Sequence, residues 1–226
     1  MTKQERLERQ IQRLEELKRP EAALHQQGYR YIAGVDEAGR GPLAGPVVAA
    51  AVILPEHFDV PGVDDSKKLS EKKRNALFPV IKEQAVAYGI GMADHRLIDQ
   101  INILQATKVA MKQALDELQL QLDGGCGTDG KEQRRISYIL LDAVELTGLS
   151  APQQSVIRGD SKVLAIAAAS ILAKVTRDRM MEQYARQYPG YAFERNKGYG
   201  TKAHYEGIRQ HGLCPIHRRS FLKNLG

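Results

Sequence analysis

Cysteine is scarce in this sequence, and long apolar runs are missing from it. Two cysteines, Cys126 and Cys214, stand among 226 residues, so we expect no disulfide framework and a reducing, cytoplasmic location. No apolar run approaches the roughly 20 residues of a membrane-spanning helix. The N-terminus is charged rather than apolar, so we expect no secretory signal. We therefore expect a cytoplasmic protein that does not bind a membrane.

The composition that remains is that of an ordinary globular protein, 42% apolar and 27% charged. A chain of this length can bury a full core, and one main domain with an appendage is the expected plan. We divide the chain into a helical arm, residues 1–28, and a main domain, residues 29–226. The main domain is expected to end in a basic helical segment from about residue 189. We expect a monomer.

The net charge of +6 is concentrated near the C-terminus. Residues 194–226 hold seven lysines and arginines against two acids, a net charge of +5. Such a segment is typical of a face that binds nucleic acid, although a solvated basic tail fits the charge alone equally well. Tyr199, Tyr205 and Phe221 lie among these charges. Because aromatic rings can stack on sugars and bases, they favour the nucleic-acid interpretation.

The arm carries an amphipathic pattern that predicts a helix over residues 2–19. Four apolar residues supply the helical spacing among dense Arg and Glu: Leu7, Ile11, Leu14 and Leu17. Pro20 predicts a break and a second short helix after it. A packing or solubilising arm is a better interpretation than a partner-binding helix.

Strands and helices alternate through the main domain. Apolar runs predict five strands, at residues 31–35, 46–54, 86–92, 136–141 and 155–158. Helical patterns cover residues 70–84 (with Ser70 as N-cap), 99–120 and 163–188. The glycine-rich stretch 121–135 has no periodicity, so we expect a loop there and no catalytic role for Cys126. The alternation predicts an α/β fold with a mixed sheet flanked by helices.

Acidic residues stand at three of the predicted strand ends. Asp36 and Glu37 follow the first strand, Asp142 follows the fourth, and Asp160 lies just beyond the fifth. Because neighbouring strand ends can converge, we expect these four carboxylates to meet, and they could not all stay ionised without cations between them. Oxygen ligands alone select Mg²⁺ or Mn²⁺. Two such ions would orient a water and stabilise the leaving oxygen at a phosphodiester.

Each acid also has an alternative interpretation. The first two acids are adjacent, so their side chains point to opposite faces unless the strand bends or ends there. Asp142 could cap the next turn and Asp160 could cap the long helix. Asp178 is a competing acid inside the long helix, but its position four residues after Lys174 favours an ion pair on the helix surface.

A glycine-rich loop follows the first pair of acids. Gly39, Gly41 and Gly45 leave the backbone open to the close approach of a bulky partner. The same spacing fits the G-x-G-x-x-A fingerprint of dinucleotide-binding folds. That alternative is disfavoured because Pro42 lies in the turn, the acids would repel a pyrophosphate, and a strand pattern rather than a helix follows.

The six histidines form no pattern of metal ligands. Cys214 with His217 is a single coincidence, which packing explains better than zinc.

The segment VDEAGRGPLAGPVV resembles the signature of type 2 ribonucleases H, and specifically of the ribonuclease HII family. The similarity continues, in family order, through DDSKKLS (64–70), INILQAT (101–107), LLDA (140–143), GDSK (159–162), AAASILAKVTRD (167–178), KGYGT (197–201) and PIHRRSF (215–221). It covers residues 31–221 and leaves out the arm and the stretch 121–135.

This resemblance implies an RNase H-like sheet flanked by helices, with a helical C-terminal portion. It also implies hydrolysis of the RNA strand of RNA–DNA hybrids and cleavage 5′ of single ribonucleotides in duplex DNA, leaving 3′-hydroxyl and 5′-phosphate ends. Such an enzyme would bind no membrane and would use Mg²⁺ or Mn²⁺. By motif position the catalytic and metal-binding acids would be Asp36, Glu37, Asp142 and Asp160.

The resemblance also implies residues that bind the substrate. Gly39, Arg40 and Gly41 would contact the ribose 2′-hydroxyl, the local mark that separates RNA from DNA. Tyr199 would stack on the next, deoxy, sugar and so detect the RNA–DNA junction. The remaining contacts would come from four residues, Ser66 and Lys67 on phosphates and Asn102 and Gln105 on the strands. A module that binds hybrids without cutting them is the alternative, and it is disfavoured because all four acids are present.

Overall fold

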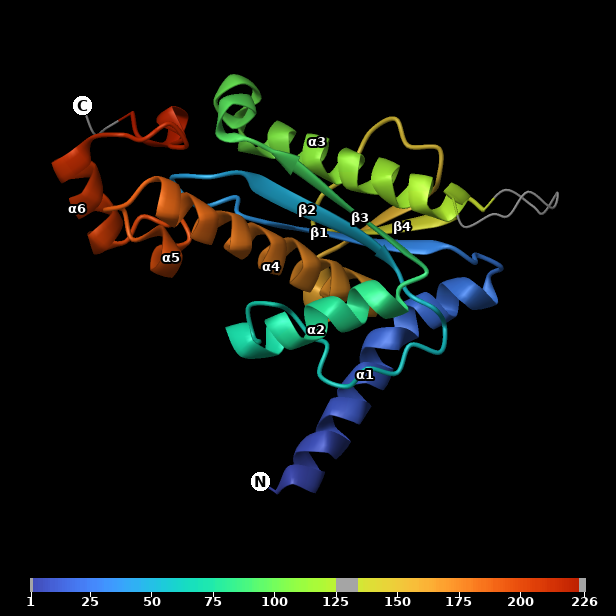
Figure 1. Cartoon of the computed structure of the whole chain (residues 1–226). Coiled ribbons are helices and arrows are strands. Elements are labelled where there is room, and N and C mark those ends of the chain that lie inside the picture. The colour runs from blue at the N-terminus through green and yellow to red at the C-terminus, as the bar shows by residue number, and fades with distance from the viewer. Residues whose placement is uncertain (1, 125–133, 224–226) are drawn as a thin grey trace.

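A mixed five-stranded sheet, in the order β3-β2-β1-β4-β5, forms the centre of the structure (Figure 1). The structure is a computed structural model that describes residues 2–124 and 134–223. The strands are β1 (Ile32–Ala38), β2 (Val47–Ile53), β3 (Ala87–Ala93), β4 (Tyr138–Asp142) and β5 (Gln153–Val156). β2 pairs antiparallel with β1 and β3, whereas β4 pairs parallel with β1 and β5. The predicted mixed-sheet α/β fold is confirmed.

Helices cover both faces of this sheet. α3 lies on one face, and α4 lies on the other together with α2 and α1 (Figure 1). The α-helices are α1 (Lys3–Gln26), α2 (Glu71–Gln84), α3 (His95–Gly124), α4 (Leu164–Gln187), α5 (Phe193–Asn196) and α6 (Lys202–His211). Two 3₁₀ helices, η1 (Gly159–Ser161) and η2 (Arg219–Phe221), complete the described elements. Ser70 caps α2 as predicted, since its side chain accepts the Lys73 N–H.

The first half of α4 is buried from end to end, because residues 164–173 are all apolar or small. Gly34 of β1 allows this helix to come very close to the sheet. A Cβ at Gly34 would lie 2.3 Å from the backbone carbon of Ala165, closer than any real contact. The start of α4, and the loop just before it, are therefore held directly against β1.

β1 is longer than predicted, and it includes the first two acids instead of ending before them. Its register with β2 pairs Asp36 with Ala50, Glu37 with Ala49 and Ala38 with Val48. This correction has a simple cause. The wholly buried β2 supplies an antiparallel hydrogen-bonding partner that local sequence did not reveal.

The predicted break at Pro20 is wrong, since α1 continues through it to Gln26. A proline inside a helix removes one backbone hydrogen bond. Here Leu14 and Leu17 pack on the core before Pro20, and Leu24 packs on it afterwards. Tertiary contacts on both sides therefore keep the helix continuous.

Two other boundaries differ from expectation. β5 ends at Val156, so Asp160 lies in η1 and not at a strand end. α3 begins at His95 and bends at Asn102, whose φ of 68° and ψ of 165° are not helical. It also extends to Gly124, into the predicted loop 121–135, and the rest of that loop with Cys126 lies outside the described residues apart from 134–135.

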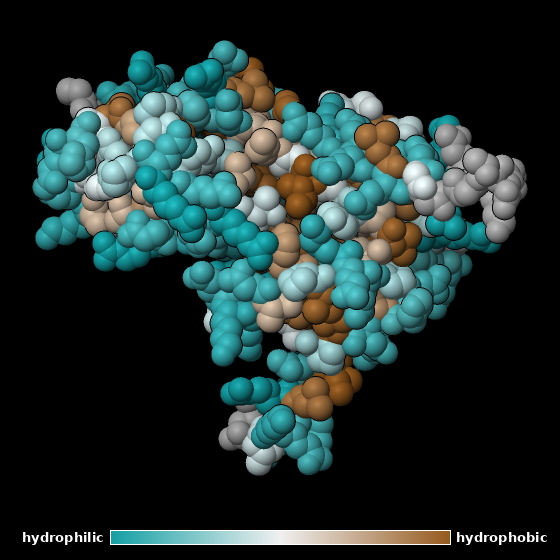
Figure 2. Space-filling model, viewed as in Figure 1, coloured by the Kyte–Doolittle hydropathy of each residue, from teal (hydrophilic) through white to brown (hydrophobic). Residues whose placement is uncertain are grey.

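Hydrophilic residues cover most of the face shown in Figure 2, with small hydrophobic patches between them. Among the described residues, no helix is both long enough and apolar enough to cross a membrane.

Candidate active site

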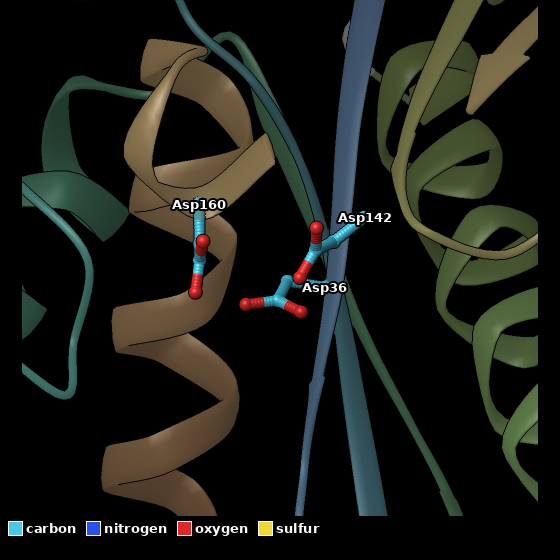
Figure 3. A group of neighbouring side chains, drawn as sticks. All are labelled: Asp36, Asp142 and Asp160. Carbon is cyan, nitrogen blue, oxygen red and sulfur yellow. The ribbon is translucent and has the colours of Figure 1, made fainter. Parts of the chain in front are cut away.

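Three aspartates meet where β1, β4 and η1 come together. One carboxylate oxygen each from Asp36, Asp142 and Asp160 lies within 4.8 Å of the other two (Figure 3). Asp36 and Asp160 are buried, and Asp142 is half-buried. Among the described residues this is the one group of three or more His, Cys, Asp or Glu side chains placed to hold a metal ion.

The sheet explains why the first two of these aspartates are neighbours. β1 and β4 are parallel, and Val35 pairs with Leu141 in their register. The next residues along the two strands are Asp36 and Asp142, which therefore stand side by side. The third aspartate comes from η1, at the point where the chain enters α4.

The electrostatics of this group favour a bound cation. Burial raises the pKa of Asp36 well above its usual range, and the charges of Glu37, Asp142 and Asp160 raise it further. Burial also raises the pKa of Asp142, although the Gly159 N–H, 2.7 Å from its Oδ1, opposes this shift. Lys67 pairs with this group, with its Nζ 3.0 Å from Asp160 Oδ2. One ammonium cannot balance three carboxylates, so the chemistry of the site fits divalent ions.

Glu37 lies beside the three aspartates but outside their closest grouping. Its side chain is largely buried, and its Oε1 pairs with Arg40 at 3.2 Å. Its Oε2 is buried and has no hydrogen-bond partner among the described residues. A buried carboxylate oxygen without a partner is costly. This oxygen is therefore a fitting ligand for a divalent metal ion.

Most of the predicted substrate residues surround one pocket of about 520 Å³. Gly39, Arg40 and Gly41 line this pocket together with Tyr199, a residue that is 46% exposed. The acids Asp36, Glu37 and Asp142 lie in its wall, as do Ser66 and Lys67. Phe221, one of the aromatic residues expected to favour nucleic-acid binding, also lines the pocket, and so does Lys174, which was not predicted as a site residue.

Asn102 and Gln105 are not among the residues that line this pocket. Both are exposed, and the Asn102 Oδ1 accepts the backbone N–H groups of Leu104 and Gln105 at 3.0 and 3.1 Å. In this structure Asn102 therefore caps the second part of α3 after its bend.

Two buried arginines, which sequence reasoning missed, shape the glycine loop. Arg218 donates to the backbone carbonyls of Gly39 (2.6 Å), Arg40 (2.9 Å) and Gly45 (2.9 Å). Its side chain is fully buried, and it forms no salt bridge with a described carboxylate. The hydrogen bonds to three carbonyls replace the usual counter-ion.

Arg177 also binds the glycine loop and its neighbours through backbone carbonyls. It donates to the carbonyls of Pro46 (2.9 Å), Lys197 (2.9 Å) and Ala44 (3.1 Å). Gly39 is needed next to it, because a Cβ at that position would lie 2.0 Å from Arg177 Nε. Both arginines stand inside the quoted motifs, but nothing in the neighbouring sequence separates them from surface arginines.

The basic C-terminal segment is thus less available to a polyanion than its charge suggests. Arg218 is bound to the loop, Lys197 pairs with Glu182 at 2.7 Å, and Arg209 pairs with Glu206. Some of the positive charges in this segment therefore stabilise the folded chain instead of being free to bind nucleic acid.

The structure supports neither capping alternative for the acids. Asp142 accepts the N–H of Gly159, which lies 17 residues later at the start of η1 and not in the turn that follows Asp142. Asp160 does not cap α4, whose N-cap is Val163. Asp178 pairs with Lys174 at 2.7 Å, as predicted, and with Arg74 at 3.8 Å. The expectation that this pair lies on the surface is wrong, because Asp178 is only 6% exposed.

Cys214 and His217 belong to a buried hydrogen-bonded chain. The Cys214 N–H donates to His217 Nδ1 (2.9 Å), His217 Nε2 lies 3.0 Å from His204 Nε2, and His204 Nδ1 lies 2.9 Å from the Tyr199 carbonyl. One set of neutral tautomers satisfies all these contacts. Burial lowers the pKa of both histidines, to about 4 for His217. This series of hydrogen bonds therefore supports the backbone of Tyr199 through two neutral imidazole rings.

Known proteins resemble this chain along most of its length. The family model described as Ribonuclease HII matches residues 33–224. A ribonuclease HII from Listeria monocytogenes serotype 4a is 55% identical over 209 residues, which cover 92% of this chain and 74% of the relative. A ribonuclease HII from Caldanaerobacter subterraneus is 51% identical over 219 residues, 97% of this chain and 85% of the relative.

Solved structures resemble the fold as well. The ribonuclease H2 of Pyrococcus horikoshii OT3 superposes with a TM-score of 0.61 and 27% identity, over 84% of this chain and 93% of that one. A Bst-RNase HIII solved in complex with Mn²⁺ has a TM-score of 0.57 at 22% identity, over 84% of this chain and 65% of that one, and supports the fold. The chain therefore belongs to the ribonuclease HII family and is a type 2 ribonuclease H, an enzyme that acts on RNA–DNA substrates.

Proposed function

We propose that this enzyme hydrolyses the RNA strand of RNA–DNA hybrids and also cuts 5′ of single ribonucleotides embedded in duplex DNA. The products would carry 3′-hydroxyl and 5′-phosphate ends. The observation that carries this proposal is the position of the three aspartates, within 4.8 Å of one another, beside the pocket lined by the glycine loop and Tyr199. A group of carboxylates suited to phosphodiester hydrolysis thus adjoins a pocket that could distinguish ribose from deoxyribose.

Asp36, Glu37, Asp142 and Asp160 are the proposed catalytic acids and would hold the metal ions. Two bound Mg²⁺ or Mn²⁺ ions would activate the attacking water and stabilise the leaving oxygen. The raised pKa of Asp36 and the partnerless oxygen of Glu37 support this assignment. The Bst-RNase HIII with Mn²⁺ is consistent with it, but the choice between the two ions is left to experiment.

The glycine loop is proposed to recognise the 2′-hydroxyl. Arg218 binds the Gly39 and Arg40 carbonyls from inside the protein, which fixes the peptide planes of the loop. Groups held in this way do not reorganise when substrate arrives, which favours selective binding. Tyr199, half exposed across the pocket, is placed to stack on the neighbouring deoxyribose.

Lys67 and Ser66 are proposed to hold phosphates near the acids. The Lys67 ammonium pairs with Asp160 in this structure. Because the Lys67 side chain is largely exposed, the ammonium could leave Asp160 and bind a phosphate. Asn102 and Gln105 would contact the strands outside the pocket, from the bend of α3. We further propose that the enzyme acts as a monomer in the cytoplasm.

The experiment is a cleavage assay on duplex DNA that contains one ribonucleotide in a labelled strand. With Mg²⁺ or Mn²⁺ we expect one product ending in a 3′-hydroxyl, on the 5′ side of the ribonucleotide. An all-DNA duplex of the same sequence and a reaction in EDTA are the controls. Cleavage 3′ of the ribonucleotide, or cleavage of the all-DNA duplex, would contradict the proposal.

A further inference from the structure

The arm α1 reaches two loops of the proposed active site through one side chain. Arg13 Nη2 donates to the Ser161 carbonyl at 2.6 Å. The same guanidinium pairs with Asp64, with Nη2 3.1 Å from Oδ1 and Nε 3.3 Å from Oδ2. Ser161 directly follows Asp160, and Asp64 begins the turn that carries Lys67, here called the DSK turn (residues 64–68). Arg13 therefore links two loops that are almost 100 residues apart in sequence.

Hydrogen bonds continue from this link to the acids. Asp64 Oδ1 accepts the Asp65 N–H, and Asp65 Oδ1 accepts the Lys67 N–H, both at 2.9 Å. Ser161 Oγ donates to Asp65 Oδ2 at 3.3 Å and accepts from Lys68 Nζ at 2.9 Å, so the two loops are also joined directly. The path ends where Lys67 Nζ meets Asp160 Oδ2 at 3.0 Å.

The last contact of this path depends on the contacts before it. The Lys67 side chain is 74% exposed, and an exposed lysine holds its partner weakly. The backbone of the DSK turn therefore determines which positions the Lys67 ammonium can reach. We propose that Arg13 is a positioning residue, which fixes both loops and so sets where Lys67 meets Asp160. This inference rests on the proposed function, because it takes these two residues to belong to the active site.

The part of α1 that carries Arg13 is firmly anchored. Leu14 and Leu17 are buried in the cluster that α4 and β2 form, and Glu21 Oε1 accepts the Ala165 N–H of α4 at 3.0 Å. Residues 2–9 of the arm are exposed, and the N-terminal end of α1 projects from the body (Figure 1). Arg13 thus stands at the edge of the anchored region, where it faces the active-site loops. The family match begins at residue 33, so it includes Asp64 and Ser161 but not Arg13.

The chain offers a matched control on the same helix. Lys18 also ties α1 to the body, with its Nζ 2.6 Å from Asp59, but this pair is outside the path to the acids. Arg13→Ala, Arg13→Lys and Lys18→Ala are compared by thermal unfolding and by kcat and KM on a hybrid. Arg13→Lys keeps a charge for Asp64 but cannot bind Asp64 with two nitrogens and still reach the Ser161 carbonyl.

We expect Arg13→Ala to lower kcat by about 3- to 10-fold, Arg13→Lys to recover part of this loss, and Lys18→Ala to keep the wild-type kcat. We also expect coupling, which a merely structural role would not produce. In a Lys67→Ala background, Arg13→Ala should change kcat by less than about twofold. Hybrid binding in EDTA should weaken by about threefold in Arg13→Ala and stay unchanged in Lys18→Ala.

The results separate this inference from the proposed function. Equal kcat values for Arg13→Ala and Lys18→Ala, or independent effects of Arg13→Ala and Lys67→Ala, would overturn the role of Arg13. If Arg13→Ala unfolds at the assay temperature, Arg13→Gln replaces it in the same cycle. A wild-type enzyme that cuts no ribonucleotide-containing substrate with either ion would instead contradict the proposed function.

Discussion

The proposed active site contains buried charged side chains of both signs. Three aspartates face one another, while Arg177 and Arg218 are buried against carbonyls instead of carboxylates. Among the described residues, no carboxylate forms a salt bridge with either arginine, so carbonyl dipoles rather than a counter-ion stabilise the positive charge. That charge lies under the loop where the phosphates of a substrate would approach, so it adds to the attraction for a polyanion.

Gly39→Ala tests how the loop is held. Its φ of 97° is left-handed, and a new Cβ would meet Arg177 Nε at 2.0 Å. We expect a loss of about 2–4 kcal/mol in the free energy of unfolding, measured with urea, and a loss of hybrid cleavage. Gly28→Ala is the matched control, because its φ is 94° but nothing lies within 4 Å. It should cost about 1 kcal/mol and leave cleavage unchanged. Equal losses of stability in the two variants would contradict the steric argument.

Tyr199→Ala tests the reading of the RNA–DNA junction. Tyr199 lines the pocket and is 46% exposed, so its side chain is available for stacking and contributes little to the core. We expect kcat/KM to fall about 10-fold or more on a single-ribonucleotide duplex and clearly less on an all-RNA hybrid, because stacking on a base or sugar contributes about 1–3 kcal/mol. Tyr199→Phe, which keeps the ring, should retain most of the activity. An equal loss on both substrates would remove the junction-reading role.

Among the elements, the C-terminal segment after α4 holds the glycine loop in place through backbone hydrogen bonds as well as through Arg218. The Leu43 N–H donates to the Gly198 carbonyl, the Gly45 N–H to the Ile216 carbonyl, and Ala44 bridges His217. Through His217, these contacts connect to the hydrogen bonds that run by way of His204 to the Tyr199 carbonyl. The loop that would bind the ribose is thus positioned by residues about 150 to 180 positions later in the chain.

This segment should be sensitive to acid through His217. Its pKa is lowered to about 4 by burial, with further effects from the contacts to Cys214 and His204. An unfolded histidine has a pKa of about 6.5 and takes up its proton first as the pH falls. Its stabilising contribution is therefore complete above pH 6.5 and should fall by about 2 kcal/mol between pH 7 and pH 5.

Urea unfolding of wild type and His217→Gln at both pH values measures this contribution. The variant should lose less stability than wild type on acidification, whereas His211→Gln, which changes an exposed histidine, should behave as wild type. Identical pH dependence in wild type and His217→Gln would contradict the assignment.

The elements also show where local sequence was sufficient. The apolar run ISYILL (136–141) correctly predicted a buried strand with Asp142 at its end, because both the strand and its end are visible in the local pattern. The continuity of α1 through Pro20 and the length of β1 were not predictable, because both depend on partners distant in sequence. Arg177 and Arg218 were missed for the same reason. Burial of an arginine by backbone carbonyls leaves no local pattern.

At the scale of the whole molecule, the sheet brings two acids together and the helical layer adds the third. α4 presses on β1 at Gly34, which brings η1 and Asp160 to the other two aspartates. The fold therefore keeps like charges close, and a bound divalent ion would relieve their repulsion.

Metal binding should consequently stabilise the folded chain. We expect Mg²⁺ or Mn²⁺ at millimolar concentration to raise the Tm of wild type by several degrees, because an ion that binds only the folded state shifts the unfolding equilibrium. Asp142→Asn should reduce this shift, whereas Asp59→Asn, which changes an exposed aspartate outside the site, should not. Equal shifts in all three proteins would show that the ions bind elsewhere.

The most direct test of the central claim compares wild type with Asp36→Asn on one RNA–DNA hybrid, measuring cleavage in Mg²⁺ and hybrid affinity in the same buffer. The carboxylate centre proposed here predicts that Asp36→Asn lowers cleavage by at least about 1,000-fold while hybrid affinity stays within about fivefold of wild type. Cleavage by Asp36→Asn at near the wild-type rate would contradict the assignment of the active site.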